Sequence, residues 1–158
     1  MAELSGETSL LRIVGKGPSF PFRFSSSGGT RSVSITEGTL RINESIRVIL
    51  STRLGERVGR PTFGSRLPEL AFEPNDDILL PMLNRETHIA IATWEKRISV
   101  KRISFIGKDG PITEDEDEIY LNALRTTNEI GIFIDYLVLR THQPGSYVHP
   151  FVRKSLPL

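Results

Sequence analysis

The sequence contains no cysteine, and only one tryptophan and two methionines occur among its 158 residues. Without cysteine there can be no disulfides, thiolate metal sites or cysteine nucleophiles, and the composition suits a reducing compartment. No apolar run approaches the ~18–20 residues that a membrane-spanning helix needs. Residues 1–8 contain two glutamates and lack the basic start and apolar centre of a signal peptide. We therefore expect a protein made in the cytoplasm, without direct membrane insertion.

Metal-binding and nucleotide-binding signatures are also missing. The histidines His88, His142 and His149 do not have the spacing of zinc ligands. The sequence has no phosphate-binding loop, no nucleophile elbow and no dinucleotide-binding glycine motif. The acidic run 114–118 lacks the spaced ligands and central glycine of a calcium loop, so we expect it to be solvated. These absences predict no metal and no cofactor.

A glycosidase would require two carboxylates at a defined separation, one of them with a raised pKa. Glu56, Glu73 and Glu95 are conceivable members of such a pair. Glu56 and Glu95 each have an arginine close by in the sequence, however, and a neighbouring arginine keeps a carboxylate ionised. We therefore expect the protein not to be an enzyme.

Positive charge is concentrated in residues 41–66, where every basic residue is an arginine. These residues are Arg41, Arg47, Arg53, Arg57, Arg60 and Arg66. Arginine makes planar, two-pronged contacts with carboxylates and phosphates and is enriched in protein interfaces. A solvated basic helix with its following loop is the plainer interpretation of several of them. Nucleic-acid binding would need a larger basic excess and interleaved aromatics, and Phe63 is the one aromatic here, so we expect no nucleic acid as partner.

The length suits one domain, which we place at residues 11–158 after a flexible leader at residues 1–10. Near its start we expect a short strand at 11–14, which is terminated by the glycine- and proline-containing segment 15–18. An extended or edge segment at 20–24 follows, because Pro21 disfavours a central strand. A flexible turn at residues 25–29 completes this region.

The spacing of apolar residues predicts two helices. Ile42, Ile46, Ile49 and Leu50 lie on one face of a helix at about residues 38–53, with Thr36 or Thr39 as N-cap and Gly55 as the stop. Residues 55–75 hold three glycines and three prolines and predict a shaped loop.

The second helix is expected after a cap at residues 75–77, and Pro81 allows a start as late as Leu79 or Leu80. Its apolar residues cover about 200° of the helix circumference, which is wider than one sheet requires. They are Leu79, Leu80, Met82, Leu83, Ile89, Ala90, Ile91 and Trp94. A second protein packed on this helix is the economical explanation, and an N-terminal segment folded over it is the alternative.

The rest of the chain has the alternation of strands. Residues 98–105 change phase near residues 101–102, which predicts a β-bulge, and 107–118 form a long hairpin tip. A strand follows at 119–123, and the alternation at 130–138 predicts the strongest and most central strand. We therefore predict an α+β fold with two main helices packed on an antiparallel sheet of about three to four strands.

Four ordered motifs resemble the gene 25-like family of baseplate wedge proteins, also called lysozyme-like, from contractile phage tails, type VI secretion systems and extracellular contractile injection systems. The longest runs from Ile42 through Arg53-Leu-Gly55-Glu56-Arg57, Pro61 and Phe63-Gly64 to Phe72. Phe20-Pro21-Phe22, Trp94-Glu95-Lys96-Arg97-Ile98 and Tyr147-Val-His-Pro150-Phe151 resemble the other three. The resemblance covers roughly residues 10–152. Lys96 replaces the family's usual proline, and Gly59 stands where a bulky residue is common.

The resemblance implies a structural subunit that joins the helical core of the wedge to the first sheath ring and initiates sheath assembly. Its partners would be helices of other wedge proteins, strands of the sheath protein and, in addition, hub or tube-proximal proteins, with six copies in a baseplate. The assembled tail or particle would be the final location. The expected partner-binding residues are Gly55, Glu56, Arg57, Pro61, Phe63, Gly64, Met82, Ile89, Trp94, Glu95 and Arg97.

Two other functions are compatible with this fold. A bacterial anti-adaptor that blocks a proteolysis adaptor uses the same architecture, so a soluble regulatory binding module is the main alternative. The motifs at residues 55–57 and 95–97 favour the wedge branch of the family. A peptidoglycan hydrolase is the third hypothesis, and the carboxylates do not support it.

Overall fold

A four-stranded antiparallel sheet occupies the centre of the computed structural model, which describes residues 14–27, 30–74, 78–107, 110–112 and 129–153. The predicted leader at 1–10 and the predicted strand at 119–123 lie outside these residues. The strand order is β6-β5-β7-β8. The bounds are β5 (Ile98–Gly107), β6 (Gly110–Ile112), β7 (Glu129–Val138) and β8 (Pro144–Val152).

The predicted central strand is confirmed, because β7 pairs with β5 on one side and β8 on the other. Its alternate residues from Ile130 to Val138 are all buried, as a half-apolar strand packed beneath helices requires. The predicted bulge is also confirmed, because the register of β5 shifts between Val100 and Arg102.

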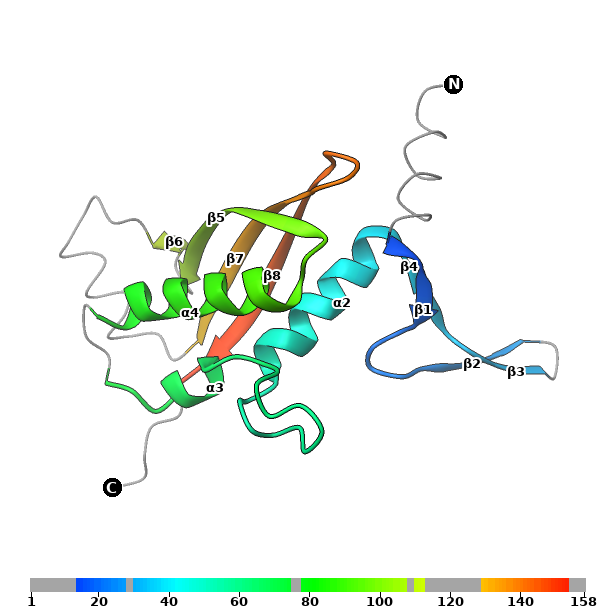
Figure 1. Ribbon diagram of the computed structural model, residues 1–158, viewed down its shortest axis with the longest axis horizontal. Helices are drawn as coiled ribbons and strands as arrows, with labels where there is room; N and C mark the ends of the chain where they lie inside the picture. Colours follow the sequence, from blue (N-terminus) through cyan, green and yellow to red (C-terminus); the bar gives the residue numbers. More distant parts are fainter. Residues whose placement is uncertain (1–13, 28–29, 75–77, 108–109, 113–128, 154–158) are drawn as a thin grey trace.

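Two long helices cover one face of the sheet, and a short one lies beside them (Figure 1). They are α2 (Gly38–Ser51), α3 (Leu67–Leu70) and α4 (Leu79–Trp94). Helix α4 packs on β5, α2 packs on β8, and the two helices contact each other. Their predicted apolar residues Ile42, Ile46, Leu83 and Ile91 are fully buried. This arrangement confirms the predicted α+β class. None of the described helices has the length and apolarity needed to cross a membrane.

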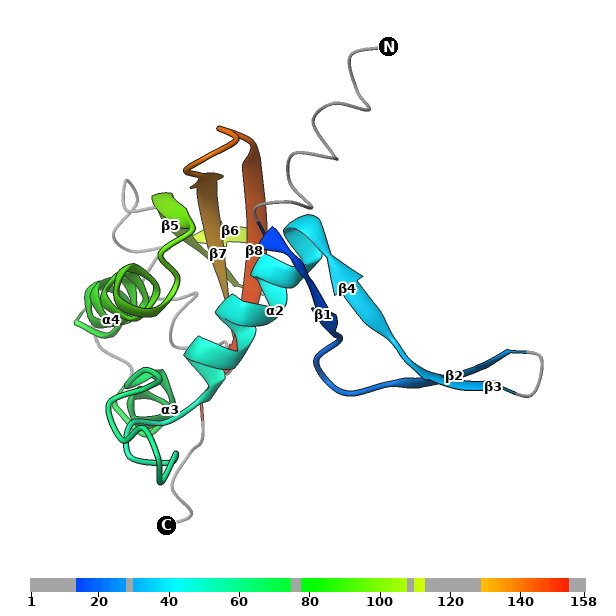
Figure 2. The ribbon, with the colours of Figure 1, turned by 45° about the vertical axis from the view of Figure 1, so that its right-hand side comes forward.

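A narrow β-structured arm, residues 16–37, extends from the start of α2 away from the sheet and the other helices (Figure 2). Its base is the ladder of β1 (Lys16–Pro18) with β4 (Ile35–Glu37), and its outer part is the hairpin of β2 (Phe24–Ser27) with β3 (Thr30–Val33). We call residues 16–37 the arm from here on.

The arm corrects the prediction for the N-terminal region. Val14, the described part of the predicted strand at 11–14, is helical, and residues 16–18 form a strand where we expected a strand to end. Residues 25–27 also belong to a strand rather than to a turn. Glycine, proline and serine carry weak strand signals, and the pairing with residues 30–37 supplies the hydrogen bonds that fix the backbone here.

The helix caps differ from the expected ones. The N-cap residue of α2 is Glu37, whose side chain makes no capping hydrogen bond. Thr36, one of the two expected N-caps, instead donates from Oγ1 to Glu44 Oε2 at 2.6 Å. Helix α2 ends at Ser51, before Gly55, and Thr52 donates from Oγ1 to the Val48 carbonyl at 2.6 Å. Helix α4 begins at Leu79 as expected, with Ile78 as N-cap, and the proposed cap at 75–77 lies outside the described residues.

Outside the arm, three elements were not predicted. Helix α3 lies within the loop predicted at 55–75, and β6 lies within the predicted hairpin tip, where it pairs with Phe105–Gly107. Strand β8 was missed because Pro144 and Pro150 argue against a strand in sequence. An edge strand tolerates proline, because an amide that faces away from the sheet has no ladder bond to lose.

Candidate assembly interface

Glu95 and Arg97 form a two-pronged ion pair at the junction between α4 and β5. Arg97 Nε donates to Glu95 Oε1 at 2.6 Å, and Arg97 Nη2 donates to Glu95 Oε2 at 2.5 Å. The Glu95 side chain is 3% exposed and that of Arg97 is 32% exposed. Such paired, charge-assisted bonds fix the orientation of both side chains. The junction therefore holds the helix and the strand at a defined angle.

Further contacts join this ion pair to other parts of the chain. Arg97 Nη1 donates to the Val14 carbonyl at 3.3 Å, and the Arg97 carbonyl accepts from the Leu139 amide at 2.9 Å. Burial opposes ionisation of Glu95, but hydrogen bonds from Arg97 and Ser45 and the charge of Arg97 outweigh it and lower the Glu95 pKa. Arg97 thus contacts the N-terminal segment and the end of β7, and Glu95 contacts α2.

Tyr136 adds a second buried polar group beside this junction. Its hydroxyl donates to Asn43 Oδ1 on α2 at 2.8 Å. Burial and the nearby charge of Glu95 raise the pKa of Tyr136 to about 12. The tyrosine therefore stays neutral near neutral pH and links β7 to α2 by a hydrogen bond.

The segment between α2 and α3, residues 52–66, is called the arginine loop below. Backbone hydrogen bonds close its neck, because Ser65 N donates to Thr52 O at 2.9 Å and Gly55 N donates to Pro61 O at 2.7 Å. Gly64 has a φ of +121°, and a Cβ placed there would lie 2.2 Å from Thr52 O. Glycine is therefore required at position 64 by both backbone conformation and space.

Three of the expected partner-binding residues stack on one another at the base of the arginine loop. The rings of Phe63 and Trp94 have centroids 5.1 Å apart and are tilted by 58°. The Arg57 guanidinium lies over the Phe63 ring, 4.1 Å from its centroid. Such cation–π and tilted ring contacts contribute roughly 0.5–1.5 kcal/mol each. The stack joins the arginine loop to the end of α4, next to the Glu95–Arg97 pair.

A groove of about 320 Å³ lies between the base of the arm, α2 and the arginine loop. Phe20 and Phe22 line it from the arm, Glu44 and Val48 from α2. Phe63 and Arg97 complete the wall. The groove thus brings together the motif at residues 20–22 and the arginine loop, which are more than thirty residues apart in sequence.

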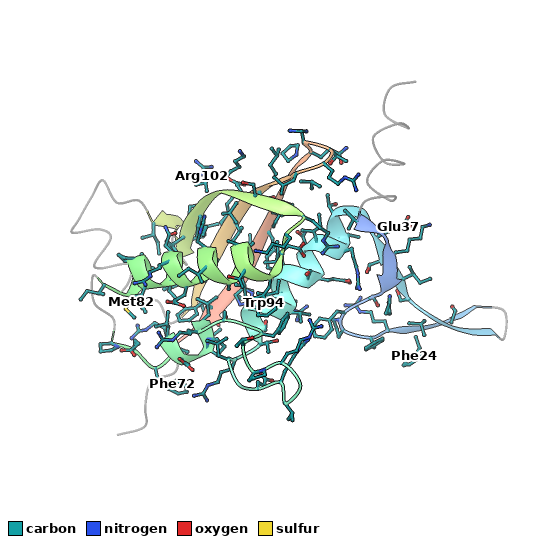
Figure 3. The ribbon with its side chains drawn as sticks, viewed as in Figure 1. Phe24, Glu37, Phe72, Met82, Trp94 and Arg102 are labelled. Carbon is teal, nitrogen blue, oxygen red and sulfur yellow. The ribbon has the colours of Figure 1, made fainter. Side chains whose placement is uncertain are left out.

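Met82 and Ile89 lie elsewhere. Figure 3 shows Met82 toward the N-terminal end of α4 and Trp94 at its other end. The side chain of Met82 is 37% exposed and that of Ile89 is 46% exposed, whereas Leu83 and Ala90 beside them are buried. The predicted apolar arc therefore divides into a buried face and a second, exposed surface.

The arm carries exposed apolar residues that were not among the expected partner-binding residues. Phe22, Phe24 and Ile35 are 67%, 77% and 64% exposed. The alternation of phenylalanine at positions 20, 22 and 24 was visible in the sequence, but without the pairing of β2 and β3 it did not indicate an exposed ribbon.

The three candidate carboxylates have different surroundings. Glu95 is held by Arg97 as described, and exposed Glu56 accepts a hydrogen bond from the Arg53 amide at 2.8 Å. Glu73 is exposed in the turn that follows α3. Within the described parts of the chain, no three His, Asp or Glu side chains gather in a way that could hold a metal ion.

Comparison with known proteins gives a consistent assignment. The family model described as baseplate wedge protein gp25 matches residues 36–141. A crystal structure of a candidate tail lysozyme from Geobacter sulfurreducens is 30% identical, with a TM-score of 0.55, covering 72% of this chain and 89% of that one. A chain of the anti-feeding prophage baseplate is 21% identical, with a TM-score of 0.56, covering 95% of this chain and 91% of that one.

No curated protein sequence matches the chain. The family match nevertheless spans more than half of the sequence and includes α2, the arginine loop, α4 and the central strands. The relative at 30% identity is covered over most of its length. The chain therefore belongs to the family of the baseplate wedge protein gp25.

Proposed function

We propose that this chain is a structural wedge subunit of a contractile, phage-tail-like injection machine, and that it joins the core of the wedge to the first sheath ring. The observation that carries the proposal is the buried Glu95–Arg97 pair, which fixes α4 against β5. A subunit that connects two other parts must keep its two binding surfaces at a constant angle. The pair and the Phe63–Trp94 contact supply that rigidity.

The helix side supplies the first of these surfaces. Met82 and Ile89 expose apolar side chains on α4. Exposed apolar surface on a helix suits an amphipathic helix from another protein, which would bury it in a small bundle. Helices of neighbouring wedge subunits are the expected partners.

The sheet supplies the second binding surface. Strand β8 is nine residues long and lies at an edge of the sheet, so its outer side can accept a strand from the sheath protein. Pro144 and Pro150 each lack an N–H, which removes two donors and limits unspecific pairing along this edge. A sheath strand would then pair mainly with the segment between the two prolines.

The proposed role requires no catalysis. We expect the purified chain to leave a peptidoglycan suspension turbid, because Glu95 is held ionised by Arg97 and Glu56 is exposed to solvent. Clearing of the suspension by the wild-type chain, lost in Glu56→Gln or Glu95→Gln, would show instead that a carboxylate is catalytic.

Deletion of the gene in the producing cells tests the proposal as a whole. Electron micrographs of lysates should show no sheathed particles, and a plasmid copy of the gene should restore them. The restored particles should contain the chain. Sheathed particles at normal yield from the deletion strain would contradict the proposed role.

A further inference from the structure

The arm is a single ribbon with one interruption. Ser34 N donates to Arg23 O and Ser34 O accepts from Ser19 N, both at 2.8 Å. The strand from Thr30 to Glu37 therefore pairs first with β2 and then with β1, while residues 20–22 bulge out of the ladder. Val33 and Ile35 are two residues apart on this strand, and Phe24 is the direct cross-strand neighbour of Val33.

Phe24, Val33 and Ile35 consequently share one face of the ribbon. They are called the arm face below. Their side chains are 77%, 43% and 64% exposed, although each is an apolar residue with a strong strand preference. Apart from each other, β2 and β3 have few neighbours within the described chain, and Figure 2 shows them projecting clear of the helices and the sheet.

A two-stranded hairpin alone is at best marginally stable in water. Contiguous exposed apolar surface on a soluble protein marks an interaction site or a liability for aggregation. The arm face combines both features, because within the described residues its strands have no third strand and its large side chains remain 43–77% exposed. A binding partner would resolve both problems at once.

The charge of the arm indicates which kind of partner fits. Residues 17–36 contain Arg23 and Arg31 and no acidic residue. At the base of the arm, Lys16 and Glu37 pair with each other at 2.8 Å. Arg23 alternates with Phe24 and is exposed on the opposite face of the ribbon, so a partner that encloses the ribbon also meets positive charge, which carboxylates would complement.

The same charge disfavours two other occupants. A second arm around the first would be a poor match in charge, because residues 17–36 contain two arginines and no carboxylate in either copy. Insertion into a lipid bilayer would place the tip first, and residues 25–30 consist of three serines, two glycines and a threonine. The apolar residues lie along the shaft, so the surface suits a groove that encloses the ribbon from the side.

We propose that the arm face docks into an apolar groove with an acidic rim on a different protein subunit of the same assembly. The inference rests on the proposed baseplate role and adds a third binding surface to α4 and the sheet. The Phe20 and Phe22 side chains continue the apolar surface from the arm toward the groove beside Phe63 and Arg97.

Photo-crosslinking in the producing cells identifies the occupant. The chromosomal gene is deleted, and a full-length copy carries the photoreactive residue p-benzoylphenylalanine in place of Phe24. Irradiation should give one adduct with a different particle subunit, and its cross-linked peptide should contain apolar residues flanked by aspartate or glutamate. An adduct with a second copy of the chain, an adduct with lipid, or particles that contain the chain without any adduct would overturn the inference.

Substitutions give an independent measure. Phe24→Ser and Arg23→Glu should each lower the amount of chain in purified particles about tenfold or more, since each removes a contact of the docked ribbon. Thermal unfolding of the purified variants should match wild type because both side chains are exposed. The control is Leu139→Ser, at a half-exposed apolar residue of the turn after β7, and it should enter particles normally.

The outcomes separate this inference from the proposed function. Wild-type chain absent from particles would contradict the baseplate role and the docking arm together. Wild-type chain present, with Phe24→Ser and Arg23→Glu incorporated equally well, would contradict the docking arm alone.

Discussion

His149 is a buried histidine on β8 whose Nδ1 has no hydrogen-bond partner in the described structure. Burial, with a smaller effect of the Arg47 charge, lowers its pKa to about 4 from an ordinary value of 6.5. The unfolded chain therefore binds a proton at this site below pH 6.5, whereas the folded chain does so only near pH 4. Stability must fall as the pH falls through this window.

Because of this histidine, we expect the free energy of unfolding to fall by roughly 3 kcal/mol as the pH is lowered from neutral to 4. A His149→Phe variant should show a flatter dependence on pH from 6.5 to 4 in denaturant titrations. His88→Gln, at an exposed position, should keep the wild-type dependence. Glu95 remains in all three proteins, so the difference between the curves reports on His149. Equal slopes for wild type and His149→Phe would contradict the assignment.

Gly64 and Gly59 provide a matched pair within the arginine loop. Gly64→Ala places a Cβ 2.2 Å from Thr52 O in a residue with a φ of +121°, whereas a Cβ at Gly59 meets nothing within 4 Å. We expect Gly64→Ala to lower the free energy of unfolding by about 2 kcal/mol or more, and Gly59→Ala to leave it nearly unchanged. Chemical denaturation of the two purified variants gives the comparison. Equal stability would mean that the neck of the loop is not held as described.

At the scale of the elements, α4 has a buried face and an exposed apolar surface. Its buried face covers β5, and Met82 and Ile89 form its exposed apolar surface. We expect Met82→Glu or Ile89→Glu to reduce co-purification with other wedge subunits about tenfold, because a charge in an apolar interface must be desolvated. The control is His88→Glu, at an exposed position on the polar strip.

Folding of these α4 variants should be unaffected, because the substituted side chains are partly in solvent already. Circular dichroism and the midpoint of thermal unfolding would verify this. Undiminished pull-down of wedge subunits by both glutamate variants would show that this surface is not an interface.

The elements that periodicity defines were the ones that could be predicted. Helices α2 and α4 and strand β7 bury residues at the spacing of their own secondary structure, so the pattern is local and readable. The pairings of β1 with β4 and of β2 with β3 connect segments of serine, glycine and proline, in which the local signal is weak. Strand β8 depends on an edge position that no local pattern reveals.

From the sequence, Glu95 and Arg97 could be expected to lie near each other, but the geometry around them could not be predicted. Charge and spacing placed Glu95 and Arg97 at a helix–strand junction, where the structure shows their ion pair. The stacking of Arg57, Phe63 and Trp94 depends on how the arginine loop folds back on α4, which is a tertiary contact. The exposure of Phe24 likewise appears only once the arm is seen apart from the core.

At the scale of the whole molecule, the proposed role is that of a connector with a rigid centre. The sheet and the two long helices form one buried core, while the arm, the exposed surface of α4 and the edge of the sheet face outward (Figures 1 and 2). The Glu95–Arg97 pair lies where helix, strand and N-terminal segment meet. Loss of one partner of a buried pair costs roughly 3–5 kcal/mol, because the remaining charge is left without compensation.

Arg97→Lys keeps the charge but cannot make the two parallel bonds to Glu95, so it should restore only part of the function. Arg102→Ala, on the adjoining strand β5, is a suitable control. Arg102 also pairs with a carboxylate, Asp135 at 3.2 Å, but its side chain is 72% exposed. Exposed ion pairs contribute only ~0–1 kcal/mol, so this variant should assemble normally.

The most direct measurement is electron microscopy of particles from the deletion strain carrying wild-type chain, Arg97→Ala or Arg102→Ala. We expect sheathed particles at normal yield from wild type and Arg102→Ala. Arg97→Ala should give a soluble subunit with baseplates or naked tubes that lack a sheath. Full-length sheathed particles at normal yield from Arg97→Ala would contradict the claim that this junction aligns the wedge core with the first sheath ring.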